Sequence, residues 1–195
     1  DLIELASGYD FRVCIDISFR ALVAARKKLG DRGVYLLADI TALPLADNSI
    51  DAAVSLHTIY HVPADEQADA FRELYRVVKP GSAAAIAYHF GGESPAMKFM
   101  RALKHALLWP RKLLSGREPP AVPADEPAIY FFAHDHHWLA ATDFGARSEI
   151  LCFQSFGNAM FKAFVHERLG GRALLRAVSL LENLFPRLMG RIGEY

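Results

Sequence analysis

The stretch that decides the fold reads FRVCID at residues 11–16 and ISFRALVAARKKLG at residues 17–30. The first part is short, apolar and β-branched, which is typical of a buried parallel strand over 11–15 that ends at the carboxylate of Asp16. In the second part Ser18 is a typical helix cap, apolar residues recur along 19–29, basic residues fill the last turn, and Gly30 follows. The stretch therefore predicts a strand, a tight turn and a helix.

The same alternation continues to residue 89. Further strands are expected at 33–38, directly before Asp39, at 50–56 and at 82–89. A helix is expected over 65–78, where apolar residues recur every three or four positions, and Lys79-Pro80-Gly81 is expected to end it. Strands that alternate with helices through short connections predict an α/β fold with a doubly wound, mostly parallel sheet.

The second half of the chain follows another pattern. In order, the expected elements are a helix at 95–109, a proline-rich connection at 115–127, a short helix around Trp138, a strand at 147–156 and helices over 158–189 that are interrupted near Gly170 and Gly171. We expect one domain over 1–195, with a cofactor-binding core at 1–90, a substrate cover at 91–145 and a C-terminal strand with helices at 146–195.

Composition excludes several classes of protein. The chain has 195 residues, 52% of them hydrophobic, which fits one globular domain and excludes a disordered tail, a collagen-like repeat or a disulfide scaffold. The 22 basic and 22 acidic residues cancel, so net charge gives no case for nucleic-acid binding. The longest apolar run, 83–90, is far shorter than the roughly 20 residues that cross a bilayer.

Cys14 and Cys152 are expected to be buried, reduced thiols, which predicts a cytoplasmic protein.

The zero net charge is the sum of two opposed halves. Residues 1–94 contain 9 basic and 13 acidic side chains, whereas residues 95–195 contain 13 basic and 9 acidic ones. Between Glu93 and Glu118 every charged side chain is basic. The simpler interpretation of this run is a solvated helix face. The more specific alternative is a surface that binds an anionic substrate or anionic lipid.

Two carboxylates follow neighbouring strands. Ligands of doubly wound sheets bind beyond the carboxyl ends of the strands, where Asp16, Asp39 and His57 are expected. Asp16 alone is equally well explained as a cap or turn residue, although a carboxylate in this place also suits a ribose diol. Asp39 follows 23 residues later and can accept a hydrogen bond from an adenine amino group, with Ile17 and Ile40 as apolar walls. The pair predicts an adenosine site.

Four stretches carry a resemblance to a known family. They are VCIDIS at 13–18, ADITALPL at 38–45, NSIDAAV at 48–54 and FRELYRVVKPG at 71–81. In this order and spacing they resemble the motifs of class I S-adenosylmethionine-dependent methyltransferases of type 11, the ubiquinone/menaquinone-biosynthesis-like group. The resemblance covers about residues 11–90.

The resemblance implies S-adenosylmethionine as cofactor and gives several residues a role. Asp16 would bind the ribose hydroxyls, Asp39 the adenine amino group, and Ile17 and Ile40 would flank the adenine. Leu56 and His57 would lie near the methionine end, and residues 76–81 would form a structural turn.

One motif of the family is missing. Such enzymes place a first strand and a glycine-rich loop roughly 20 residues before the acidic residue. Gly8 precedes Asp16 by only 8 residues, which leaves no room for a helix between them. We therefore expect a fragment that lacks this loop and its first strand. Gly193-Glu194-Tyr195 resembles the first step of a strand, so truncation at the C-terminus is expected as well.

Methyl transfer to a hydroxyl, an amine or a carbon acid also needs a base. The candidates expected at or just beyond the carboxyl edge of the sheet are His57, Tyr60, His61 and His89. For each of them, a place in the wall of the site or as a cap is the simpler interpretation. The run His134, Asp135, His136 and His137 predicts a structural or exposed cluster and no metal site, because three histidines within four residues cannot all face one ion.

The sequence thus predicts a methyltransferase that acts on a small or lipophilic acceptor. One alternative is an NAD(P)-dependent oxidoreductase of Rossmann type, which would also use Asp16 on a ribose diol, although Asp39 and the Lys79-Pro80-Gly81 turn argue against it. The other is a non-catalytic member of the fold that binds a lipid or a partner through the basic helices at 95–109 and 172–189. That member would make a peripheral membrane contact.

Overall fold

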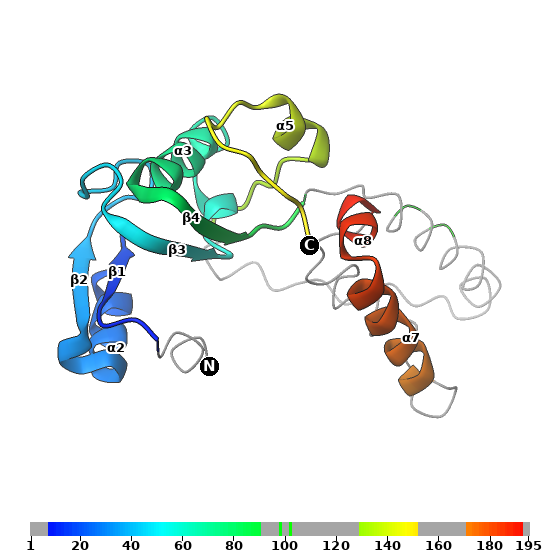
Figure 1. Cartoon of the computed structure of the whole chain (residues 1–195), viewed down its shortest axis with the longest axis horizontal. Helices are drawn as coiled ribbons and strands as arrows, with labels where there is room; N and C mark the ends of the chain where they lie inside the picture. Colours follow the sequence, from blue (N-terminus) through cyan, green and yellow to red (C-terminus); the bar gives the residue numbers. More distant parts are fainter. Residues whose placement is uncertain (1–7, 91–97, 99–101, 103–128, 152–170, 193–195) are drawn as a thin grey trace, which may run out of the picture. The chain divides into compact units, whose positions relative to one another are not determined.

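The computed structural model describes residues 8–90, 98, 102, 129–151 and 171–192 (Figure 1). The chain forms two compact units, which we call unit 1 (1–54 with 66–85) and unit 2 (55–65 with 86–195). Of the helix expected at 95–109, only residues 98 and 102 are described, and both are helical. The connection expected at 115–127 lies outside the described residues, and so does Cys152.

Unit 1 begins with the strand, turn and helix that its sequence predicts. Strand β1 is Arg12–Asp16, helix α2 is Phe19–Leu29 and strand β2 is Gly33–Leu37, with a short 3-10 turn, η1 (Gly30–Arg32), before β2. Ser18 caps α2, since its Oγ accepts the backbone N–H of Ala21 at 3.3 Å. The strands pair in parallel, with Arg12 opposite Gly33 and Asp16 opposite Leu37. Helix α2 packs against both of them (Figure 1).

A second pair of strands follows in the chain. Strand β3 is Ile50–Leu56, as predicted, and helix α3 (Gln67–Val77) connects it to strand β4 (Val78–Ala87). The N–H of Ser49 donates to the carbonyl of Val77 at 2.9 Å, and the N–H of His57 donates to that of Ala87 at 3.0 Å. The two strands therefore run in the same direction, as their arrows in Figure 1 show. Within the described ranges the sheets are β1-β2 and β3-β4, and parallel strands alternating with helices confirm the α/β class.

The turn predicted at Lys79-Pro80-Gly81 is wrong. Helix α3 ends at Val77 and β4 starts at Val78, four residues earlier than predicted, so these three residues lie within the strand. Lys79 Nζ lies 2.5 Å from Asp51 Oδ1, and this ion pair ties the start of β4 to β3. Pro80 has no N–H to donate, and Gly81 has a φ of +84°, which glycine adopts without a steric cost. A proline and a glycine that resemble a helix end are thus accommodated in an irregular strand.

The core of unit 1 is aliphatic. Helix α3 buries Ala70, Leu74 and Val77, which recur on one face at helical spacing, and Leu22 of α2 is buried as well. Cys14 in β1 is a free thiol and only half-buried, so the prediction of a buried thiol is wrong for this residue. Partial burial raises the pKa of the Cys14 thiol, which keeps it protonated.

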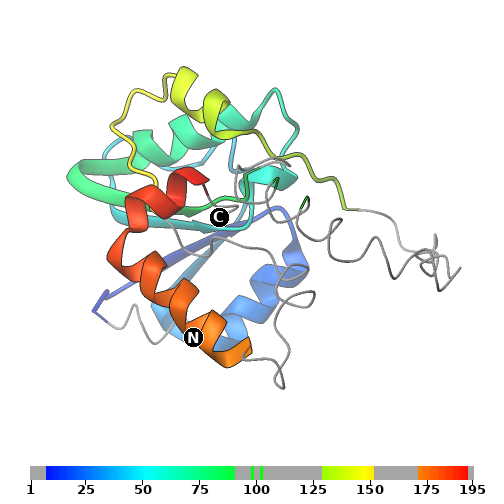
Figure 2. The same cartoon turned by 90° about the vertical axis from the view of Figure 1, so that its right-hand side faces the viewer.

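The core of unit 2 is aromatic, with Tyr60, Tyr88, Phe90 and Phe144 buried. Its described elements include the 3-10 turn η2 (Ile59–His61) and the helices α5 (His136–Ala141), α7 (Gly171–Leu184) and α8 (Pro186–Ile192) (Figure 2). Residues 147–151 form no strand, so the strand predicted at 147–156 is wrong over its described part. No helix in the ranges that the structure describes is both long enough and apolar enough to span a membrane.

Helices α7 and α8 are joined at Phe185 without a full break in helical bonding. The N–H of Phe185 donates to the carbonyl of Leu181, and the N–H of Met189 donates to that of Phe185, both at 2.9 Å. Pro186 has no N–H, so it cannot donate the helical hydrogen bond to the carbonyl four residues earlier. The sequence predicted one helix here, and the proline divides it.

Candidate functional site

Asp16 and Asp39 lie at one edge of the β1-β2 sheet. Asp16 is the last residue of β1 and is paired with Leu37, and Asp39 follows Leu37 by two residues. The N–H of Ala38 donates to the backbone carbonyl of Asp16 at 3.3 Å, so the two chain segments stay adjacent beyond the strands. Parallel pairing thus brings the two predicted carboxylates to neighbouring strand ends.

Local hydrogen bonds orient both carboxylates. Asp16 Oδ1 accepts the N–H of Ser18 at 2.7 Å. Asp39 Oδ1 accepts both the N–H and the hydroxyl of Thr41, each at 2.9 Å. Within the described part of the chain these bonds use Oδ1 of each side chain, and both residues are exposed. Each aspartate is fixed by its own turn and can accept a further hydrogen bond at Oδ2.

Apolar side chains follow both carboxylates. Ile17 is 75% exposed, an unusual state for an isoleucine, and Ile40 is half-buried. A ribose diol and an adenine amino group donate hydrogen bonds, and a purine ring needs apolar walls. Acceptors and isoleucines in this arrangement fit the adenosine part of S-adenosylmethionine.

The loop after Asp39 is bound to helix α3 by Arg76. Arg76 Nη1 donates to the carbonyl of Leu45 at 2.8 Å and to Asp47 Oδ1 at 2.6 Å, and Nη2 donates to the carbonyl of Leu43 at 3.0 Å. Glu73, one turn earlier, binds the N–H of Leu43 through Oε2 at 2.7 Å. We call these contacts the Arg76–Glu73 network.

The family resemblance implies only a structural turn at residues 76–81, so this network was not predicted. The available signal was the glutamate three residues before an arginine on one helix face, with Asp47 as a second carboxylate in the preceding loop. The hydrogen bond from Arg76 lowers the pKa of the Glu73 carboxyl, and the N–H of Leu43 lowers it further, while partial burial opposes both. Glu73 in turn raises the pKa of Arg76, so both groups stay ionised.

Leu56 and His57, predicted near the methionine end of the cofactor, lie in unit 2 at the end of β3. Leu56 is 40% exposed and His57 is exposed. His57 has a φ of +54°, which is rare for a residue with a side chain. Backbone strain of this kind is found preferentially at ligand sites, which makes this strand end a candidate site on structural grounds as well.

The four candidate bases come together around the ring of Tyr60. The centroid of that ring lies 4.6 Å from the ring of His61, 6.0 Å from that of His57 and 6.2 Å from that of His89. Phe131 closes the group at 5.0 Å. Tyr60 is buried and His89 is half-buried, whereas His57 and His61 are exposed. Solvent and small molecules can therefore reach the two exposed imidazoles most easily.

Residues 61–64 are fastened to residues 130–134 by three hydrogen bonds. His61 Nδ1 lies 2.7 Å from the carbonyl oxygen of Tyr130, and the Tyr130 hydroxyl accepts the N–H of Ala64 at 3.1 Å. His134 Nε2 lies 3.0 Å from the carbonyl oxygen of Ala64. Because a carbonyl only accepts, His61 carries its proton on Nδ1 and His134 on Nε2, and the lone pair of neutral His61 is on Nε2.

The run of residues 134–137 has packing and capping contacts. The ring of His134 stacks on Trp138 at 3.9 Å, and that of His136 stacks on Phe90 at 3.8 Å. Asp135 caps α5, where the N–H of Trp138 donates to Oδ1 at 2.8 Å and lowers the pKa of the carboxyl. Among the described residues, no three potential ligands are grouped to bind a metal ion.

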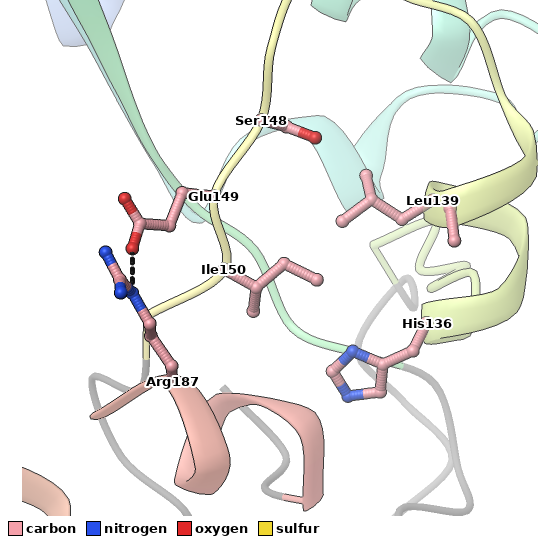
Figure 3. Close-up of a pocket in the computed structure, with 7 residues that line it drawn as sticks. His136, Leu139, Ser148, Glu149, Ile150 and Arg187 are labelled. Atoms are coloured by element: carbon pink, nitrogen blue, oxygen red, sulfur yellow. Dashed lines mark hydrogen bonds and ion pairs between the residues drawn. The ribbon is translucent and has the colours of Figure 1, made fainter. Parts of the chain in front are cut away.

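Unit 2 also contains a cavity of about 600 Å³ that the sequence did not predict. Figure 3 shows Ser148 and Ile150 pointing to the side of α5, while Glu149 between them points to Arg187 on α8. Glu149 Oε1 and Arg187 Nε are 2.5 Å apart. The cavity is lined by His136, Leu139, Ala140, Ser148, Glu149, Ile150 and Arg187. The first and last of these residues, His136 and Arg187, are 51 positions apart in the chain, so only the folded structure shows the site.

Part of the chain is similar to known methyltransferases. Residues 3–86 match the model of a methyltransferase domain of type 11. A sterol methyltransferase-like protein of Botryococcus braunii is 42% identical over 62 residues, which are 31% of this chain and 15% of that protein. An uncharacterized methyltransferase of Mycobacterium avium is 40% identical over 58 residues, which are 30% of this chain and 22% of that protein. The chain thus matches less than a quarter of the length of these relatives.

A solved structure supports the fold. The S-adenosylmethionine-dependent methyltransferase of Methanosarcina mazei superposes with a TM-score of 0.50 at 21% identity, over 71% of this chain and 69% of that one. Its Rossmann-like fold agrees with the parallel strands and helices described above. Residues 3–86, less than half of this chain, thus match a methyltransferase domain of type 11, and the described fold is that of the Rossmann-like S-adenosylmethionine-dependent methyltransferases.

Proposed function

We propose that the protein transfers a methyl group from S-adenosylmethionine to a small or lipophilic acceptor. The observation that carries the proposal is the pair of oriented carboxylates, Asp16 and Asp39, at neighbouring strand ends. They lie in the stretch that matches the methyltransferase domain. The match to the methyltransferase domain and the chemistry of the two carboxylates both support S-adenosylmethionine as the cofactor.

The cofactor would supply a methyl group on a sulfonium, which is activated for displacement. In this proposal Asp16 accepts hydrogen bonds from the ribose hydroxyls and Asp39 accepts one from the adenine amino group. Ile17 and Ile40 line the base. Leu56 and His57 serve the methionine end. The Arg76–Glu73 network supports the loop that begins after Ile40, so it positions the adenine side without touching the cofactor.

His61 is the base that the contacts favour among the four candidates. Its Nδ1 is committed to the carbonyl of Tyr130, which orients the ring and leaves Nε2 to accept a proton. Its side chain is exposed, whereas Tyr60 is buried and Nδ1 of His89 is shielded from solvent. An oriented, accessible imidazole is the arrangement that proton removal from an acceptor needs.

The cavity beside α5 would bind the acceptor. Its walls combine apolar side chains, Leu139 and Ile150, with the hydroxyl of Ser148 and the imidazole of His136. Its volume of about 600 Å³ is in the usual range for small-molecule sites. This mixture suits a largely apolar acceptor with one or two polar groups. The Botryococcus relative is named a sterol methyltransferase-like protein, which supports a lipophilic acceptor.

Calorimetry on the full-length protein tests the proposal. We expect S-adenosylhomocysteine to bind, and Asp16→Asn and Asp39→Asn each to weaken binding by at least about tenfold, because a charge-assisted hydrogen bond is lost. Asp31→Asn, an exposed aspartate in the η1 turn, is the matched control and should bind normally. Absence of binding would contradict the proposal. Tighter binding of NADH than of S-adenosylhomocysteine would favour the oxidoreductase alternative instead.

A further inference from the structure

Helices α7 and α8 present an exposed stripe of large apolar side chains. Leu180, Leu184 and Leu188 follow one another at intervals of four residues and are 58%, 60% and 56% exposed. Leu181 lies beside them and is 46% exposed. Residues four apart lie on the same side of a helix, and helical bonding continues through Phe185, so the stripe extends from one helix into the next.

Another face of the two helices is the covered one. Val178 and Glu182 are half-buried, and Met189 is 8% exposed. These positions lie roughly 100° or more around the helix axis from the centre of the leucine stripe. The contacts that hold α7 and α8 in unit 2 therefore use a face other than the stripe, and the stripe faces outward.

The charges of the two helices are segregated. Residues 171–192 contain four arginines and one glutamate. The glutamate, Glu182, is on the covered face, whereas Arg172, Arg176 and Arg187 are exposed. Arg176 is one turn before Leu180 and Arg187 directly precedes Leu188, so both arginines border the stripe. Arg187 also forms an exposed ion pair with Glu149, and such pairs are weak in water.

We propose that α7 and α8 bind an anionic lipid surface, with the leucine stripe in the interface and the arginines at the headgroups. The stripe has no hydrogen-bonding side chain to match a polar partner, and it is bordered by long cationic side chains that can extend to phosphates. The two helices have 21 residues between them, a length of about 30 Å along the surface. Peripheral binding of this kind combines apolar burial with electrostatic attraction.

Flotation of the full-length protein with lipid vesicles tests the proposal, and it needs neither cofactor nor acceptor. We expect binding to phosphatidylcholine vesicles that contain about 30% phosphatidylglycerol, weaker binding to pure phosphatidylcholine, and release at high salt. Leu184→Ser should lower the partition coefficient roughly tenfold, because one buried leucine is lost. Arg176→Gln should lower it about fivefold on the anionic vesicles only.

Leu175→Ser is the matched control, since it makes the same change in α7 away from the stripe and should leave binding unchanged. Far-UV circular dichroism verifies that each variant keeps its helices. Equal binding of Leu184→Ser and the parent protein would overturn the proposal, and so would equal binding to neutral and anionic vesicles. If the parent protein binds no vesicles and Leu184→Ser turns a dimer into a monomer in light scattering, the stripe is a contact between copies of this chain instead.

Discussion

The guanidinium of Arg76 binds the carboxylate of Glu73 through two parallel hydrogen bonds, 2.6 Å from Nε to Oε1 and 2.7 Å from Nη2 to Oε2. The same two side chains bind the backbone of the loop at Leu43 and Leu45. That loop follows Asp39 and Ile40, the proposed adenine contacts. The shape of the loop therefore depends on an ion pair in helix α3.

Glu73→Ala should destabilise the protein by about 2 kcal/mol, because it leaves the N–H of Leu43 and the guanidinium without their acceptor. Glu73→Gln should cost less, since its amide oxygen can still accept one of these bonds. Asp69→Ala is the matched control: it removes the exposed partner of Arg72 in the same helix and should cost less than about 0.5 kcal/mol. Urea unfolding measures all three, and equal losses for Glu73→Ala and Asp69→Ala would contradict a structural role for the network.

The Arg76–Glu73 network should also make stability sensitive to acid. The pKa of Glu73 is lower in the folded protein than in the unfolded chain, where it is about 4.3. The contribution of this carboxylate is therefore fully present above that value and is lost as the pH falls through the lower, folded-state pKa. Urea midpoints measured from about pH 7 to about pH 3 should fall more steeply for the parent protein than for Glu73→Gln. Parallel curves would show that Glu73 is not coupled to folding.

Local patterns in the sequence were enough to predict the elements that local physics fixes. Ser18 and Gly30 mark the ends of α2, and the helix has the predicted bounds. Strand β3 also has its predicted bounds. Lys79-Pro80-Gly81 misled the prediction, because this tripeptide is typical of a helix end and only the pairing of β4 with β3, with Lys79 bound to Asp51, shows it to be a strand.

The candidate site likewise has one part that the sequence could predict and another that it could not. Asp16 and Asp39 could be predicted, since a carboxylate after each of two parallel strands reaches one sheet edge by topology alone. The cavity could not be predicted, because His136 and Arg187 meet there only through tertiary packing. The tautomer of His61 also depends on a distant residue, the carbonyl of Tyr130, which no periodicity indicates.

The positive φ of His57 predicts that glycine and alanine variants at this position differ in stability in the opposite order to the same variants at Thr58. At a φ of +54°, alanine meets a steric cost that glycine avoids, so His57→Gly should be more stable than His57→Ala by about 1 kcal/mol. Both variants lose the imidazole, and their difference therefore measures the backbone alone. The neighbouring Thr58 has a φ of −105°, so there the alanine variant should be the more stable one. Thermal unfolding of the four variants checks this, and the same order at both positions would contradict it.

His61→Asn separates a catalytic from a structural role for the imidazole. The asparagine Nδ2–H can replace Nδ1–H in the bond to the Tyr130 carbonyl, but the variant has no equivalent of Nε2. If His61 is the base, methyl transfer should fall by about 100-fold or more, while stability and S-adenosylhomocysteine binding stay unchanged. Transfer of radiolabelled methyl groups from S-adenosylmethionine to a total lipid extract provides the rate.

A third variant, His61→Ala, distinguishes the two roles further. His61→Ala should lose both the base and the bond to Tyr130, and so be less active and less stable. A structural histidine gives the opposite result: His61→Asn then keeps the rate of the parent protein, and only His61→Ala loses activity and stability. In that case another of the candidate bases around Tyr60 would take the proton, and His57 is the next exposed imidazole to substitute.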